Sequence, residues 1–235
     1  MNTNASSDGL AVVIGASGAL GAALVQQLQT DTRFTQVLGL SRQSQPALDL
    51  LDEASIAAAA AYVASTNLPL RLVIDATGFL HDSQHQPEKS WRQIDPSQMV
   101  RVFALNAIGP ALLMKHFLPL LDAPGPSVLA TLSAKVGSIG DNRLGGWYSY
   151  RASKAALNQL VRTAAIELQR RQPHALCVAL HPGTVHSDLS APFAKTGLSV
   201  VSPQVAAQRL LAVLAQLQPA DSGGFFNHDG AALPW

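Results

Sequence analysis

The stretch Val12-Val13-Ile14-Gly15-Ala16-Ser17-Gly18-Ala19-Leu20-Gly21 decides the fold of this chain. It places three glycines between a hydrophobic strand pattern and a helix pattern, with two residues between successive glycines. Gly15 allows a tight turn, Gly18 lets backbone N–H groups approach a pyrophosphate, and Gly21 lets the helix pack closely on the strand. An ordinary glycine-containing turn is the alternative, but the flanking strand and helix favour dinucleotide binding. The candidate phosphate-binding residues are Gly15, Ser17, Gly18, Leu20 and Gly21.

Outward from this turn, short β-branched runs alternate with longer helical patterns, which is typical of a parallel sheet with helical crossovers. The predicted strands are Ala11–Ile14, Gln36–Leu40, Arg71–Asp75, Val128–Ser133, Ala175–His181 and Gly224–Asn227, with a weaker one at Ala47–Leu50. The predicted helices are Ala19–Gln29, Ser55–Ser65, Ser97–Leu121, Ser149–Arg171 and Pro203–Leu217, and Asp52 or Ser55 is expected to cap the second. The sequence therefore predicts an α/β fold with a doubly wound parallel sheet of about seven strands and helices on both faces.

Length and composition indicate one folded domain. The chain has 235 residues, of which 48% are hydrophobic and only 13% charged, so a disordered chain is excluded. We expect a flexible segment over residues 1–9 and one catalytic domain over residues 10–235. The formal net charge of +1 and the lack of a basic block make nucleic acid an unfavourable partner. One cysteine, Cys177, excludes an internal disulfide, and the N-terminus does not resemble a signal peptide. We therefore expect a cytoplasmic protein without a membrane partner.

The end of the second predicted strand indicates which dinucleotide binds. In such folds an acidic residue at this place binds the 2′-hydroxyl of the adenosine ribose. Here Ser41 and Arg42 offer a hydroxyl and a guanidinium, which suit a 2′-phosphate and favour NADP over NAD, although Arg42 can also be a solvated surface arginine. Asp49 can accept a hydrogen bond from the adenine amino group, or is simply an aspartate at a strand end.

Tyr150 and Lys154 carry the candidate chemistry. They lie four residues apart on a predicted helix, so both side chains project from the same face. A neighbouring cation stabilises a phenolate, so we expect the pKa of Tyr150 to fall toward working pH and the phenol to serve as proton donor and acceptor.

With these residues in place, the sequence from Leu10 to Trp235 resembles the short-chain dehydrogenase/reductase family. The glycine turn, Asn106, Tyr150 with Lys154, and Pro182-Gly183 fall in the family's order. The stretches Val136–Gly140, Gly145–Arg151 and the end of the chain look like the branch that contains C-factor-like proteins and sniffer-type carbonyl reductases. The resemblance implies a single-domain Rossmann fold.

The resemblance also implies a mechanism. Tyr150 would protonate the carbonyl oxygen while a hydride arrives from the nicotinamide, and Lys154 would hold the nicotinamide ribose and tune Tyr150. Asn106 matches the asparagine that orders a water in the proton relay, or it is a helix-interior amide that binds backbone. Further residues match the segments that line the cofactor: Ala76, Thr77, Gly78, Pro182, Gly183, Val185 and Ser187.

The chain departs from the family pattern at its catalytic serine. Ala134 takes the serine position when the Ser-x-x-Gly pattern is laid on residues 134–137. Ser133 is the nearest hydroxyl and our candidate for the catalytic role, with Ser138 as the fallback. The glycine turn also has its middle glycine at Gly18 rather than at position 19, and the asparagine-rich turn of the family keeps only Gly78.

The sequence leaves two functions open. The first is an NADP-dependent carbonyl reductase or alcohol dehydrogenase, acting on a small carbonyl or alcohol at the loops 79–96 and 185–202, which follow strands of the sheet. The second is a cofactor-binding signalling or regulatory protein of the C-factor type with weak or no turnover. An epimerase or dehydratase is disfavoured, and His81 with His85 lacks the third ligand that a zinc site needs. The family commonly forms dimers or tetramers through the helices predicted at 97–121 and 149–171, and we expect a homo-oligomer.

Overall fold

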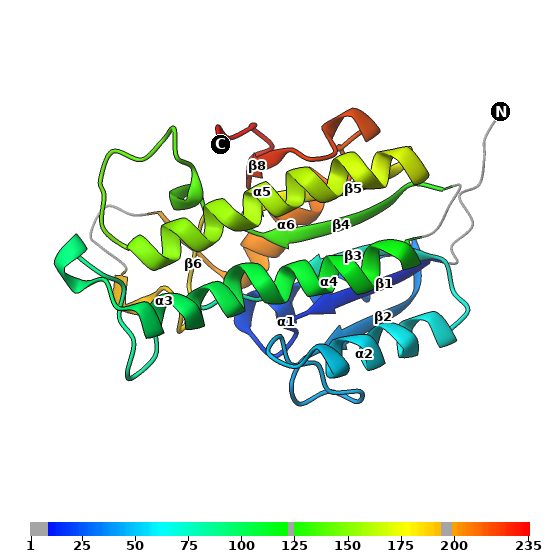
Figure 1. The fold of residues 1–235 in the computed structure, drawn as a ribbon. Helices are drawn as coiled ribbons and strands as arrows, with labels where there is room; N and C mark the ends of the chain where they lie inside the picture. The colour runs from blue at the N-terminus through cyan, green and yellow to red at the C-terminus, as the bar shows by residue number, and fades with distance from the viewer. Residues whose placement is uncertain (1–8, 122–124, 194–198) are drawn as a thin grey trace.

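A computed structural model describes residues 9–121, 125–193 and 199–235. Its centre is a parallel sheet of six strands in the order β2-β1-β3-β4-β5-β8 (Figure 1). The strands are β1 (Gly9–Ile14), β2 (Phe34–Leu40), β3 (Leu70–Asp75), β4 (Ser127–Leu132), β5 (Ala175–His181) and β8 (Phe225–Asn227). A separate pair, β6 (Thr184–Val185) and β7 (Val200–Val201), lies beyond the end of β5. The predicted doubly wound α/β fold is confirmed. Gly9 opens β1, and residues 1–8 of the predicted N-terminal segment lie outside the described residues.

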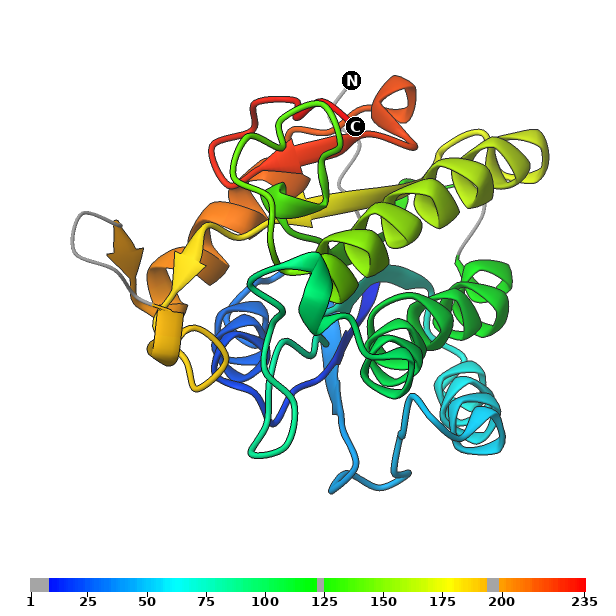
Figure 2. The same cartoon turned by 60° about the vertical axis from the view of Figure 1, so that its left-hand side comes forward.

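Helices cover both faces of the sheet because successive side chains of a strand point to opposite faces. In β1, Leu10, Val12 and Ile14 pack into one buried core with α2 (Glu53–Ser65), α4 (Gly109–Phe117) and α5 (Tyr148–Arg171). Ala11 and Val13 pack on the other side with α1 (Ala19–Leu28) and α6 (Pro203–Leu214). Figure 2 shows the resulting three layers. A continuous apolar strand such as β1 therefore serves two cores at once.

Helix starts follow the local sequence. The Asp52 carboxylate accepts a hydrogen bond from the N–H of Ala54 and caps α2, so of the two predicted caps the aspartate is used. Ser202 caps α6 in the same way, ahead of Pro203 at the first turn. In the third predicted helix the cap is Asp95, which accepts from Gln98 N at 2.8 Å.

The weak strand prediction at Ala47–Leu50 is wrong. In this segment, side chains form hydrogen bonds with backbone groups that a strand would pair with a neighbouring strand. The Ser55 hydroxyl accepts from Asp49 N at 2.9 Å and donates to Asp49 O at 3.1 Å, and the Asp49 carboxylate accepts from Leu51 N. The segment therefore forms an irregular entry to α2, and the main sheet has six strands.

The single helix predicted over 97–121 is a continuous rod of four segments. It comprises α3 (Pro96–Phe103), a π-helical turn (Ala104–Ile108), α4, and a 3-10 turn (Leu118–Leu120). Pro110 has no N–H to donate to the carbonyl of Asn106, and Gly109 N donates five residues back to Ala104 O, so the wider turn forms at this place.

By length and composition alone the rod is long and apolar enough to cross a membrane. It packs against α2 and α5, and core helices of soluble proteins pass the same test. The rod therefore gives only weak evidence for a membrane span.

Candidate active site

The carboxyl ends of the strands form one edge of the sheet, and a cleft of about 450 Å³ opens there. In the order β2-β1-β3-β4, the connection after β1 runs to one side of the sheet and the connection after β3 runs to the other, and open parallel sheets bind ligands at such a point. The cleft is lined by residues from β1 and the glycine turn, from the ends of β2 and β3, and from the rod. Among them are the predicted residues Gly15, Ser17, Gly18, Ser41, Arg42, Asp49, Ala76, Thr77 and Gly78.

The glycine turn has the geometry that its sequence predicts. Gly15 has a φ of +84°, which a residue with a side chain rarely adopts. A Cβ on Gly21 would lie 2.2 Å from Gly15 O, so only glycine permits this approach of α1 to the strand. Gly18 is the N-cap of α1 and gives no side-chain cap, so the first N–H groups of the helix are left for a ligand. An anion such as a diphosphate fits this helix end. Leu20 and Gly21 lie in α1 and do not line the cleft.

The end of the cleft beside β2 holds a free guanidinium. Arg42 is exposed and has no carboxylate partner in the described part of the chain. The Ser41 hydroxyl accepts from Gln43 N at 3.1 Å, while Ser41 N donates to Ser44 Oγ at 2.8 Å, which shapes the loop after β2. No acidic residue stands at the end of this strand, so the loop can receive an anionic group.

A buried carboxylate holds the turn after β3. Asp75 is 2% exposed and accepts from Thr77 N at 3.0 Å, from Thr77 Oγ1 at 2.5 Å and from Thr131 Oγ1 at 2.7 Å. These bonds join the ends of β3 and β4 and fix the backbone of residues 76–78. The sequence did not indicate this role for Asp75, because its partner Thr131 lies 56 residues further along the chain.

Tyr150 and Lys154 lie on the first two turns of α5, and the Lys154 Nζ atom lies 6.0 Å from the Tyr150 ring centroid. Lys154 is buried and donates to Leu132 O at 2.8 Å. Burial lowers the pKa of Lys154 to about 8, although the charge of Asp75 opposes this shift. Burial also raises the pKa of Tyr150 to about 12. The predicted lowering of the tyrosine pKa is therefore wrong for the chain without a cofactor, because desolvation of the phenolate outweighs the nearby ammonium.

Asn106 is fully buried in the π-helical turn and binds the chain after Gly78. Its Oδ1 accepts from Phe79 N at 2.8 Å, and its Nδ2 donates to Phe79 O at 2.7 Å and to Ser153 Oγ at 3.2 Å. The side chain thus joins the loop after β3 to the rod and to α5, between Tyr150 and Lys154. Of the two interpretations from sequence, the hydrogen bonds of the side chain are those of an amide that binds backbone.

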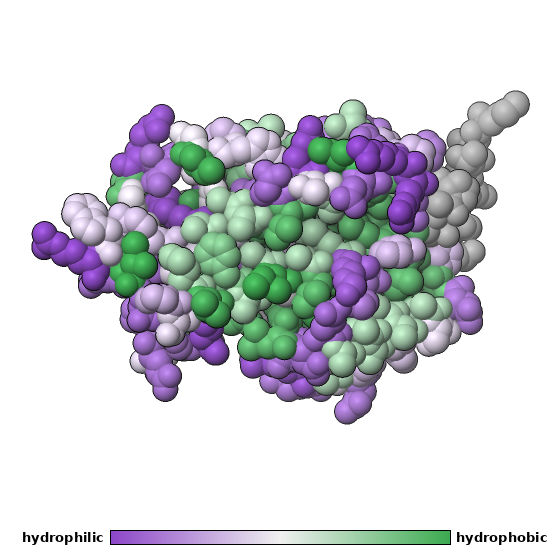
Figure 3. Space-filling model, viewed as in Figure 1, coloured by the Kyte–Doolittle hydropathy of each residue, from purple (hydrophilic) through white to green (hydrophobic). Residues whose placement is uncertain are grey.

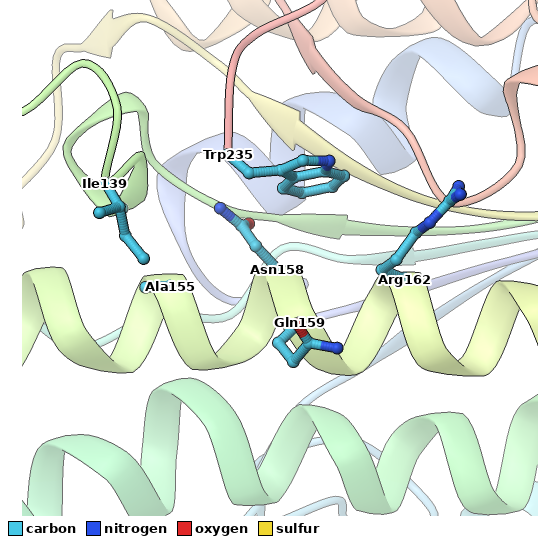
Figure 4. A pocket seen from close by; sticks show the side chains of 7 residues that line it. Ile139, Ala155, Asn158, Gln159, Arg162 and Trp235 are labelled. Atoms are coloured by element: carbon cyan, nitrogen blue, oxygen red, sulfur yellow. The ribbon is translucent and has the colours of Figure 1, made fainter.

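The two candidate serines have other partners. The Ser133 hydroxyl donates to Asn158 Oδ1 at 2.6 Å, about 12 Å along α5 from Tyr150. Figure 4 shows Asn158 beside Trp235, in a pocket of about 190 Å³ that shares no lining residue with the cleft. The Ser138 hydroxyl donates to Trp235 O at 3.3 Å and accepts from Asp141 N at 3.1 Å. Neither hydroxyl can meet a carbonyl beside Tyr150 without leaving these partners, and Ala134 presents only a methyl group.

The predicted nicotinamide segment follows β5 and is shaped by its neighbours. Gly183 has a φ of +77°, and a Cβ there would lie 2.7 Å from the His228 ring. Val185 is buried and pairs with Val201 in the small sheet. The Ser187 hydroxyl donates to Val185 O at 3.4 Å. Pro182, Gly183, Val185 and Ser187 do not line the cleft as it stands.

A chain of aromatic contacts lies beside Tyr150. Trp147 meets the Tyr150 ring edge to face with centroids 6.1 Å apart, and Phe193 meets Trp147 at 5.1 Å. His81 continues the chain against Phe193 at 5.2 Å. Both loops that the sequence proposed for substrate contribute to this wall, and residues 194–198 of the second lie outside the described residues. No periodic signal in the sequence indicates Phe193 as part of this wall.

Comparisons with known proteins agree with this geometry. Residues 5–216 match the family described as enoyl-(acyl carrier protein) reductase. C-signal of Myxococcus xanthus is 36% identical over 142 residues, which cover 60% of this chain and 81% of that protein. A 1-hydroxy-2-glutathionyl-2-methyl-3-butene dehydrogenase of Rhodococcus sp. (strain AD45) is 31% identical over 191 residues, 81% of this chain and 80% of that one. The NADPH-bound carbonyl reductase from chicken fatty liver superposes with a TM-score of 0.84 at 28% identity, over 97% of this chain and 94% of that chain.

Proposed function

The chain belongs to the short-chain dehydrogenase/reductase family and is an NAD(P)-dependent oxidoreductase of it, and from this premise we propose that it is an NADPH-preferring carbonyl reductase. The observation that carries the proposal is one shared edge of the sheet. A dinucleotide cleft with an uncapped helix N-terminus opens there, and Lys154 Nζ, beneath Tyr150, lies 3.8 Å from the Cβ position of Gly78 in that cleft. A cofactor bound in this cleft would therefore lie close to Lys154 and Tyr150.

The preference for NADP rests on the loop after β2. Arg42 offers an unpaired guanidinium at the cleft, and Ser41 stands where an acidic residue would repel a 2′-phosphate. The carbonyl reductase from chicken fatty liver is named as binding NADPH, which supports the same assignment.

In the proposed reaction, the cleft at the glycine turn would hold a nicotinamide cofactor, which would supply the hydride for the carbonyl carbon. The Tyr150 phenol gives its proton to the carbonyl oxygen, so the product is an alcohol and the phenolate is left on the enzyme. The Lys154 ammonium stabilises that phenolate, and it is held in place by Leu132 O. Asn106 bonds both the loop after Gly78 and Ser153 of α5, so it holds that loop against the start of α5 beside Tyr150.

The substrate class follows from the wall beside Tyr150. Trp147, Phe193 and His81 present ring faces and edges, and together they favour a small carbonyl compound with an apolar or aromatic substituent. The same site serves alcohol oxidation when the cofactor is oxidised.

One observation favours a second candidate function. Ala134 supplies no hydroxyl, and Ser133 and Ser138 are bonded elsewhere, so one donor toward the substrate oxygen is missing. Loss of one such donor lowers a rate by about 10²-fold. A cofactor-binding regulatory protein with weak turnover fits this site, and the similarity to C-signal supports the same class.

Oxidation of NADPH and of NADH across a panel of aldehydes, ketones and quinones tests the proposal, with Tyr150→Phe as the matched variant. We expect turnover with NADPH to exceed turnover with NADH and to fall at least 10²-fold in Tyr150→Phe, whose cofactor affinity stays unchanged. Tight NADPH binding without turnover on any carbonyl would favour the regulatory function. Turnover that Tyr150→Phe leaves intact would refute the mechanism.

A further inference from the structure

Glu88 is a buried charge that the reaction proposed above does not use. Within the described residues the charged side chains classed as buried are Asp75, Glu88 and Lys154, and the first and last belong to the candidate site. Glu88 lies in the loop between β3 and α3 and is 2% exposed. In the described part of the chain no lysine, arginine or histidine forms an ion pair with it. A buried carboxylate needs donors, so its partners show what it does.

Those partners are the first residues of α5. The Glu88 carboxylate accepts hydrogen bonds from Ser149 N, at 3.2 Å to Oε2, and from the Ser149 hydroxyl. The main-chain carbonyl of Glu88 accepts from Trp147 N at 2.5 Å. One residue of a distant loop therefore satisfies three donors at the helix start.

The helix start needs such support because it has no cap of its own. Trp147 is the N-cap of α5 and gives no side-chain cap, and it has a φ of +53°. Gly145 and Gly146 before it have φ values of +63° and +66°. A left-handed conformation is rare for a bulky residue such as tryptophan and persists only where its surroundings hold it. A Cβ on Gly146 would lie 3.4 Å from Glu88 O, so the whole turn lies against the Glu88 backbone.

Tyr150 follows Ser149 directly, and Trp147 touches the Tyr150 ring. We propose that Glu88 is a positioning residue that caps α5 from the loop after β3 and thereby sets where Tyr150 stands relative to the dinucleotide cleft. This inference rests on the proposed function, because it assigns Glu88 a part in carbonyl reduction. It also joins the substrate loop 79–96 to the proton donor, so a shift of that loop moves the phenol.

The negative charge is part of the arrangement. The N-terminus of a helix carries a partial positive charge, which a carboxylate offsets and a neutral amide does not. A glutamine at position 88 would keep the size of the side chain but offer one acceptor oxygen and an NH₂ group, which cannot accept from Ser149. Glu88→Gln is therefore a sharp test that leaves no cavity.

The experiment compares Glu88→Gln with Asp95→Asn, which removes a helix-capping carboxylate from the same loop but at α3. For each protein, NADPH titration by fluorescence gives the number of competent sites and the cofactor affinity. We expect Glu88→Gln to keep its NADPH affinity within about twofold while kcat per competent site falls about 10- to 100-fold, since small misplacements of a reacting group have effects of this size. Asp95→Asn should retain the wild-type kcat.

Two further readouts separate positioning from folding. Without the carboxylate, the positive end of α5 is no longer offset beside the phenol, so the pKa that governs kcat should fall in Glu88→Gln. Hydrogen exchange of the amides at residues 147–149 should become faster in this variant and stay unchanged in Asp95→Asn. Glu88→Asp keeps the charge and should recover part of the lost kcat.

The inference is overturned if kcat per competent site and the pH profile of Glu88→Gln match the wild type, or if Asp95→Asn shows the same loss. Failure of the proposed function looks different, because the wild type then reduces no carbonyl. In that case the hydrogen-exchange measurement tests Glu88 independently. Unchanged exchange of the amides at 147–149 in Glu88→Gln would refute the capping of α5 by Glu88 as well.

Discussion

At the scale of single residues, the candidate site depends on which polar groups are already paired. Tyr150, Lys154 and Asn106 could be identified as candidate site residues from the sequence, because their spacing and neighbouring residues are local properties. The sequence left open which hydroxyl replaces the family serine, whose position Ala134 occupies. The direction of a side chain at a strand end depends on the group with which it forms a hydrogen bond. Here Ser133 finds Asn158, 25 residues further along the chain. Such a pairing leaves no periodic signal in a sequence.

The missing hydroxyl gives the first prediction. Ala134→Ser places a hydroxyl donor at the position where the family has its serine. We expect kcat to rise by up to about 10²-fold, the reverse of the loss when one preorganised donor is removed. Steady-state kinetics with NADPH and the best carbonyl of the panel measure this. Ser133→Ala is the control, and a larger loss from Ser133→Ala than gain from Ala134→Ser would return the catalytic role to Ser133.

Lys154 gives a second prediction at this scale. Its pKa is about 8 in the folded chain, against 10.5 for an ordinary lysine. Between these values the unfolded chain binds the proton and the folded chain does not, so the free energy of unfolding rises with pH in this window. Tyr150 acts in the opposite direction only above pH 10, because its pKa is raised to about 12.

Urea unfolding of the cofactor-free protein from pH 7.5 to 9.5 measures this effect. The wild type should gain stability with rising pH relative to Lys154→Met, which has no proton to lose at this position. Parallel stability curves for the two proteins would mean that Lys154 keeps an ordinary pKa in the folded chain.

At the scale of elements, local pattern predicted most of the strands and helices, and tertiary contacts explain the failures. β5 has the predicted bounds, since an apolar run flanked by polar residues is unambiguous. The rod over 96–120 was predicted as one helix because the break in its hydrogen-bond ladder comes from one proline inside a continuous apolar pattern. Residues 47–50 were expected to pair as a strand, but the Ser55 side chain takes both backbone groups of Asp49.

The contact between α1 and the glycine turn gives an element-scale prediction. A methyl group in Gly21→Ala would lie 2.2 Å from Gly15 O, which forces α1 away from β1. We expect a loss of about 1–3 kcal/mol in the free energy of unfolding, the usual cost of overpacking, together with weaker NADPH binding. Gly18→Ala is the matched control, because its Cβ would meet only Gly15 O at 3.4 Å.

Urea midpoints and NADPH fluorescence titration measure both effects. Gly18→Ala should keep the stability of the wild type, since the added methyl makes only an ordinary van der Waals contact with Gly15 O. Equal destabilisation by the two variants would show that helix propensity, rather than the close approach of α1, governs this turn.

At the scale of the whole molecule, the small share of charged residues corresponds to an apolar region on one face of the surface. Figure 3 shows apolar residues gathered over the rod and the neighbouring part of α5, with hydrophilic residues around them. Val100, Ile108 and Ile166 are exposed on these elements, with Ile108 at 56%. One face of the rod carries residues 100, 104, 108 and 111. Because the side chains of Ala104 and Ala111 are small, a second helix can approach this face closely. Composition alone showed that charge was sparse, but not where.

This face carries the last prediction, that the protein is a homo-oligomer whose copies meet through the rod and α5. Sedimentation of the wild type at micromolar concentration should show a dimer or a tetramer. Ile108→Glu puts a charge on this face, where a carboxylate buried without a partner in the interface is unfavourable, so this variant should sediment as a smaller species. Val205→Glu is the control. It changes an exposed apolar residue to the same charge on α6, across the sheet, where a glutamate three residues after Ser202 favours the helix start. A monomeric wild type, or equal dissociation of both variants, would contradict an interface at this face.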